Sequence, residues 1–122
     1  MSYLFSFEKL EVYQLSREFV KDIYNLTKDF PGDEKYGIIS QIRRAAISIP
    51  NNLAEGSGRT SGKDQAMFTS YSYSSLMEVL NLLMLATDLS FLEEEIYAQI
   101  RPKIYEISNK LNSLRKSQLR RK

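Results

Sequence analysis

The sequence predicts an all-α protein that folds as an up-down-up-down four-helix bundle. Apolar residues recur at spacings of three and four along four segments, which is the period of a helix that buries one face. No segment alternates polar and apolar residues over the length of a strand, and turn residues fall only between the helical segments. Short connections favour antiparallel neighbours, so the 122 residues are predicted to form one bundle domain.

The first helix is predicted at about residues 8–29. Val12, Phe19 and Ile23 recur with helical spacing and define its buried face. A Pro-Gly pair at residues 31–32 ends the segment, because proline disfavours helix at the residue before it and glycine accepts the turn that follows.

The second helix is predicted at about residues 34–55, and its apolar seam continues across Pro50. A proline inside a helix removes one backbone hydrogen bond and bends the helix. We therefore expect a bend at Pro50 and a C-terminal cap at Gly56. Asn52 and Glu55 are predicted to satisfy backbone groups that the bend frees, although the sequence also allows them to contact a ligand.

The third and fourth helices are predicted at about residues 62–88 and 91–118, each opened by a capping box that starts with a serine. The third is apolar on nearly all sides between residues 76 and 86, whereas a small bundle buries only one side of each helix. The apolar side that the bundle leaves unburied predicts a contact with another copy of the chain. The predicted interface residues are Leu76, Val79, Leu80, Leu83 and Met84.

Positive charge is concentrated near the end of the sequence. The net charge is +2, yet residues 110–122 form a basic tail with six basic residues and no acid. The remainder holds eleven basic against fifteen acidic residues. Clustered cations bind phosphate by releasing counterions, although cations also suit the dipole of a helix C-terminus. The predicted nucleic-acid contacts are Arg43, Arg44, Arg59, Lys63, Lys110, Arg115, Lys116, Arg120 and Arg121.

The composition argues against most enzyme chemistry. The chain contains no cysteine and no histidine, which excludes thiolate catalysis and removes the commonest general base and metal ligand. The segment GSGRTSGKD lacks the spacing of a phosphate-binding loop. We expect no catalytic residue, no metal and no cofactor. We also expect a cytoplasmic protein without a membrane span or a signal peptide, because no long apolar run occurs.

Residues 41–58 read QIRRAAISIPNNLAEGSG. With the surrounding residues 7–92, this stretch resembles the bacterial 23S rRNA-intervening-sequence proteins. The resemblance implies four-helix protomers that assemble as ring-shaped homopentamers. That family also includes the accessory protein of diversity-generating retroelements, which binds nucleic acid and a reverse transcriptase, but this chain lacks a strongly basic body. The most specific matches to the family pattern are Gln41, Arg43, Arg44, Ala45, Ser48, Asn52, Glu55 and Gly56.

Two functions of different class remain open. The first is a non-enzymatic oligomer that binds RNA or DNA without sequence preference, or that acts as an adaptor for RNA or for a nucleic-acid-handling protein. The alternative is a protein–protein interaction scaffold with no nucleic-acid role. No predicted element is shaped to read base edges in a groove of the duplex, so any nucleic-acid binding is expected to ignore sequence.

Overall fold

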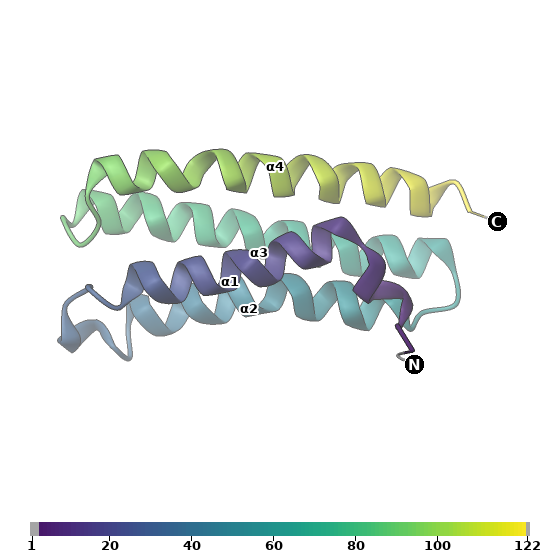
Figure 1. The fold of residues 1–122 in the computed structure, drawn as a ribbon, viewed down its shortest axis with the longest axis horizontal. Helices are drawn as coiled ribbons and strands as arrows, with labels where there is room; N and C mark the ends of the chain where they lie inside the picture. The colour runs from purple at the N-terminus through teal and green to yellow at the C-terminus, as the bar shows by residue number, and fades with distance from the viewer. Residues whose placement is uncertain (1–2, 122) are drawn as a thin grey trace.

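The computed structural model describes residues 3–121, which form four long helices and two short 3₁₀ helices and contain no strand. Figure 1 shows the four helices side by side, with consecutive helices running in opposite directions. Each helix packs on its neighbours along the chain, and α1 also contacts α4, so α1 and α3 lie diagonally. The predicted all-α fold with four helices is confirmed. The elements are η1 (Ser6–Lys9), α1 (Glu11–Thr27), η2 (Gly32–Glu34), α2 (Ile38–Ser57), α3 (Gly62–Asp88) and α4 (Glu94–Leu119).

The core runs along the whole bundle and receives side chains from all four helices. Fully buried examples are Phe19, Ile42, Leu83 and Ile107, one from each helix. Burying a side chain of this size stabilises the fold by about 1.5–3 kcal/mol relative to leaving it in water. Within residues 3–121, no helix combines the length and the apolar character needed to cross a membrane.

The first two helices begin later than predicted. α1 begins at Glu11 because Leu10 is extended, with φ −72° and ψ 124°, and the residues before it form η1. α2 begins at Ile38 because Glu34 belongs to η2 and a turn leads to Gly37, which takes the N-cap position. In both places the backbone conformation of a connecting segment delays the helix.

The last two helices show one correct and one incorrect start. Ser61 caps α3 as predicted, and its Oγ accepts the amide hydrogen of Asp64 at 3.0 Å. Ser90 does not cap α4. It has a positive φ of 63°, and Glu93 takes the N-cap position without a side-chain hydrogen bond. α4 therefore begins three residues later than predicted.

α2 continues without interruption through Pro50 and ends at Ser57, so the predicted cap Gly56 is itself helical. Gly58 takes the C-cap position instead. Gly56 is buried, and a Cβ added there would lie 2.7 Å from the Cβ of Phe68 in α3. The glycine therefore allows close approach of α2 and α3 rather than ending a helix.

Asn52 belongs to a polar network between α2 and α3. Its Nδ2 donates to the carbonyl oxygen and to the hydroxyl of Ser48, both at 2.9 Å, and Ser75 Oγ of α3 donates to the same hydroxyl at 2.8 Å. The backbone group that Pro50 leaves without a donor is the carbonyl of Ala46, which is not the carbonyl that Asn52 contacts. The role predicted for Asn52 was therefore wrong, and its observed role is to join the two helices. The remaining polar residues of the predicted motif are exposed: Gln41 and Glu55.

α3 offers less apolar surface to another chain than its sequence predicts. Leu76, Val79 and Leu83 are fully buried in the core of the protein's own bundle, so the structure assigns them to that core rather than to an interface. Leu80 is half-buried against the core, whereas Met84 is 46% exposed. The large apolar side chains that α3 does expose are Met67, Tyr71, Met84 and Leu85.

Candidate nucleic-acid interface

One group of predicted contacts lies at one end of the bundle. Residues 57–64 lead from α2 to α3, and residues 115–121, which contain the end of α4, lie beside them (Figure 1). Gly62 packs so closely on the carbonyl of Gln118 that a Cβ would overlap it, and Thr69 Oγ1 donates to Gln118 Oε1 at 2.7 Å. These contacts make the last turns of α4 part of the packed bundle. The predicted contacts brought to this end are Arg59, Lys63, Arg115, Lys116, Arg120 and Arg121.

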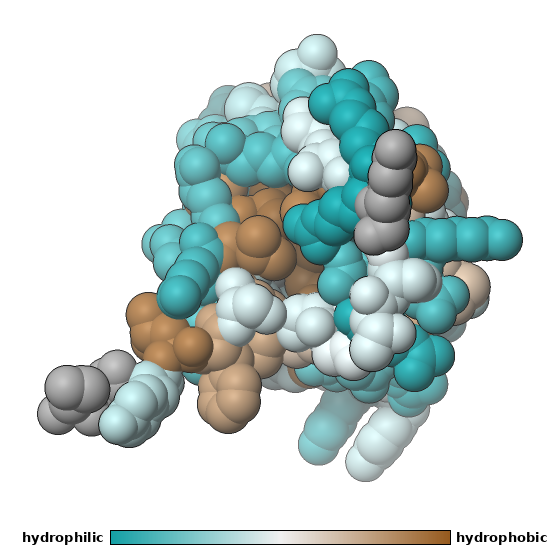
Figure 2. Space-filling view, turned by 90° about the vertical axis from the view of Figure 1, so that its right-hand side faces the viewer, coloured by the Kyte–Doolittle hydropathy of each residue, from teal (hydrophilic) through white to brown (hydrophobic). Residues whose placement is uncertain are grey.

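The two ends of the bundle carry opposite charge. We define the basic end as residues 3–9, 57–64 and 115–121, which hold seven basic and two acidic residues, a net charge of +5. The acidic end, residues 28–37 and 88–95, holds seven acidic and two basic residues, a net charge of −5. Lys122 of the predicted tail lies outside the described residues. Figure 2 views the basic end and shows hydrophilic side chains around a central apolar surface.

The cations of the basic end are exposed to solvent. The guanidinium of Arg59 lies 5.0 Å from the ring centroid of Phe68, and Arg121 donates to Gln65 Oε1. Within the described part of the chain, none of the basic-end cations forms an ion pair. Their charge therefore remains available to an anionic partner.

Lys110 lies in a different setting from the rest of the predicted tail. Its Nζ is 3.1 Å from Glu11 Oε1, and Lys103 Nζ is 2.7 Å from Asp22 Oδ2, so two ion pairs join α4 to α1. Exposed pairs of this kind contribute about 1 kcal/mol or less. The charge of Lys110 is already compensated within the bundle.

A second group of predicted contacts lies on the side of the bundle. Arg43 and Arg44 lie on α2, about 20 Å along the helix axis from its end at Ser57. Arg43 is half-buried: Nε donates to Thr27 Oγ1 at 2.8 Å and Nη2 to the Tyr24 carbonyl at 3.4 Å, with the guanidinium 4.4 Å from the Tyr24 ring centroid. Arg43 thus ties α2 to α1, whereas Arg44 is exposed. The predicted contacts do not form a single site.

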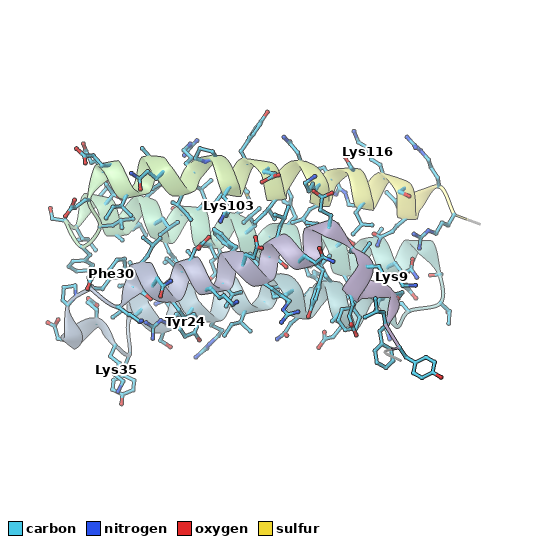
Figure 3. All side chains as sticks on the ribbon, viewed as in Figure 1. Lys9, Tyr24, Phe30, Lys35, Lys103 and Lys116 are labelled. Atoms are coloured by element: carbon cyan, nitrogen blue, oxygen red, sulfur yellow. The ribbon has the colours of Figure 1, made fainter. Side chains whose placement is uncertain are left out.

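Cations of α1 and of the α1–α2 loop were absent from the predicted contacts. Arg17, Lys21 and Lys35 line the same side of the bundle as Arg43 and Arg44. In Figure 3, Tyr24 and Lys35 lie on the side formed by α1 and α2, whereas Lys103 projects from α4.

A signal for these cations exists in the sequence. The basic residues of the α1 region recur at spacings of four and seven, and so do its acids, which places the two sets on different sides of the helix. The basic set is Arg17, Lys21 and Lys28, and the acidic set is Glu11, Glu18, Asp22 and Asp29.

The arrangement is suited to binding anions. Among residues 3–121, no group of three or more carboxylates lies close enough together to hold a metal ion. The exposed cations of the basic end and of the α1–α2 side can contact phosphate by charge and hydrogen bonding.

Residues 8–113 match the family model described as 23S rRNA-intervening sequence protein. The chain belongs to this family. Its fold is similar to the crystal structure of a protein of unknown function from the S23 ribosomal protein family of Bacteroides thetaiotaomicron VPI-5482. The two are 27% identical, with a TM-score of 0.78 over 86% of this chain and 98% of that chain. No curated protein matches this chain.

The family match includes the cations on the side of the bundle and only part of those at the basic end. It includes α1 and α2, and with them Arg43 and Arg44, but it stops at residue 113. The cations of residues 115–121 therefore lie beyond the region that matches the family. Any role for them has to be argued from this chain alone.

Proposed function

We propose that the protein is a non-enzymatic homo-oligomer that binds RNA or DNA through backbone phosphates, without reading sequence, in the cytoplasm. The observation that supports this proposal is the basic end, whose net charge of +5 is exposed and forms no ion pair among the described residues. Cations clustered in this way release counterions from a nucleic acid when they neutralise its phosphates. Binding should therefore weaken steeply as salt rises.

The shape of the basic end supports binding without sequence preference. Phosphate contacts position a protein on nucleic acid, whereas contacts with base edges specify sequence. Reading those edges in duplex DNA requires a helix or a β-ribbon that enters the major groove. The basic end presents a loop and a helix terminus around an apolar centre (Figure 2), so its cations reach phosphates rather than bases.

We propose a homopentameric ring as the assembled form, as the family resemblance implies. The exposed apolar side chains of α3 could supply the contact, and heterologous contacts that close on themselves generate rings. Five copies of +2 would also give the ring a charge of +10.

The second candidate is a protein–protein interaction scaffold with no nucleic-acid role. The exposed apolar side chains of α3 favour it, because apolar surface of this kind often marks a contact with protein. The two proposals also combine, since an adaptor would bind both nucleic acid and a nucleic-acid-handling protein.

Light scattering with and without generic RNA tests the proposal, at about 50 mM salt, where phosphate contacts are strong. We expect the mass of five chains in the free protein and a larger complex once RNA is added, with the complex dissociating as salt is raised. A monomer at micromolar concentration would contradict the ring. A stable oligomer that ignores both RNA and DNA would favour the scaffold.

A further inference from the structure

A long groove runs between the outer sides of α1 and α2. Two hollows of about 420 and 380 Å³ lie along it and share Ile47 as a wall. Their α2 walls extend from Ile39 to Ala54, which corresponds to about 22 Å at the rise of an α-helix. We name this feature the basic groove after the five cations that line it: Arg17, Lys21, Lys35, Arg43 and Arg44.

Acidic residues adjoin the basic groove at one end, where Lys35 and Tyr36 belong to the acidic end of the bundle. Among the residues of the described chain that line the groove itself, none is acidic. The acids of α1 lie on the other side of that helix, where Glu11 and Asp22 pair with lysines of α4. A groove lined by one sign of charge raises the local concentration of the opposite sign, so its ligand should be an anion with several charges along its length.

Aromatic rings lie beside the cations of the basic groove. Lys35 Nζ is 5.7 Å from the ring centroid of Tyr36, and the guanidinium of Arg43 is 4.4 Å from that of Tyr24. Tyr36 is 90% exposed, so its ring is open to a further planar group. Exposed rings next to cations are the arrangement on which the bases of single strands stack while their phosphates meet positive charge.

Part of the basic groove is fixed before any ligand arrives. The hydrogen bonds from Arg43 to Thr27 and to the Tyr24 carbonyl hold its guanidinium between α1 and α2. A cation held in place loses less conformational freedom on binding than a flexible one, so more of its interaction energy appears as affinity. Arg44 and Lys35, which are exposed, remain free to adjust to the spacing of the phosphates.

We infer that the basic groove binds single-stranded nucleic acid, with a base stacked on Tyr36 and phosphates beside Arg44 and Arg17. This inference rests on the proposed function and names its substrate class. A duplex keeps its bases stacked inside, so Tyr36 adds nothing to duplex binding. Every base has a flat face, so the binding is tolerant of sequence.

The test measures binding of one fluorescent DNA strand, free and annealed to its complement, to Tyr36→Ala and to the intact protein. We expect Tyr36→Ala to weaken single-strand binding by about 5- to 150-fold, the range for losing one stacked base, and to leave duplex binding unchanged. Tyr36→Phe should restore single-strand binding, because the ring rather than the hydroxyl stacks. The matched control is Tyr105→Ala, an exposed tyrosine of α4 whose loss should change neither affinity.

Several outcomes would overturn the inference. One is that Tyr36→Ala and Tyr105→Ala weaken single-strand binding equally, and another is that Tyr36→Ala weakens single-strand and duplex binding equally. A third is that polyglutamate competes as strongly as DNA, which would show that the protein recognises charge alone. The proposed function is tested separately by neutralising Lys63 and Arg120. If duplex binding survives Tyr36→Ala but weakens in that variant, the proposed function stands even where the inference fails. If the intact protein binds neither form of the DNA, both the inference and the proposed function fail.

Discussion

The basic end and the basic groove carry the same sign of charge, but they hold it differently. The cations of the basic end lie on exposed side chains from segments far apart in the sequence, joined only by the topology of the bundle. The basic groove holds Arg43 by two hydrogen bonds and against a ring. Exposed charge attracts any polyanion, whereas a groove that combines a fixed cation with an exposed ring can select among polyanions. The number of cations alone therefore does not define a site.

The two regions also owe their charge to different causes. At the basic end, Lys116 lies in the last turn of α4, where cations favour the negative end of the helix dipole. In the basic groove, the charge comes from the facing sides of α1 and α2 and from Lys35 between them, whereas Glu11 and Asp22 of α1 pair with lysines of α4. The charge of the basic end depends on residues at the ends of helices, and the charge of the basic groove depends on residues along their sides. Substitutions can therefore alter each region separately.

The largest expected effect comes from breaking the basic end at Gly62. Gly62→Ala would drive a Cβ into the carbonyl of Gln118 and separate α3 from the last turn of α4. We expect the free energy of unfolding in urea to fall by about 1–3 kcal/mol, as for other overpacked sites. Gly32→Ala is the control, because nothing lies within 4 Å of a Cβ added there. Gly62→Ala protein as stable as the control would show that the close contact is unimportant.

A smaller effect is expected from loosening the basic groove at Arg43. Arg43→Lys keeps the charge but loses the hydrogen bond from Nε to Thr27 Oγ1. We expect the free energy of unfolding to fall by about 1 kcal/mol, with weaker single-strand binding. Arg44→Lys is the matched control on the same helix, because Arg44 is exposed, and it should leave stability almost unchanged. Equal stability of the two variants would contradict the fixed position of Arg43.

Local patterns predicted the faces of the helices better than their ends. The buried faces of α1 and α2 follow from apolar spacing alone, because a helix repeats regularly. The starts of α1 and α4 were wrong because Leu10 and Ser90 take conformations set by the segments around them. Only tertiary packing shows that Leu76 and Leu83 are buried within one chain.

The candidate site was predicted only in part for the same reason. Arg43, Arg44 and the cations near the end of the sequence could be named from charge alone. That Lys110 pairs with Glu11 could not, because its partner comes from the other end of the chain. The basic groove was missed because it exists only where α1 packs beside α2, although the separated charges of α1 were visible in the sequence.

The salt dependence of duplex DNA binding tests most directly whether the basic end contacts phosphate. Lys63→Gln/Arg120→Gln removes two exposed cations from that end, and Lys28→Gln/Arg101→Gln removes two exposed cations elsewhere with the same change in net charge. We predict that the slope of log affinity against log salt becomes shallower by about 0.9 for each lost phosphate contact in the first variant, and stays unchanged in the second. Equal slopes in the two variants, or no binding by the intact protein at about 50 mM salt, would contradict nucleic-acid binding through the basic end.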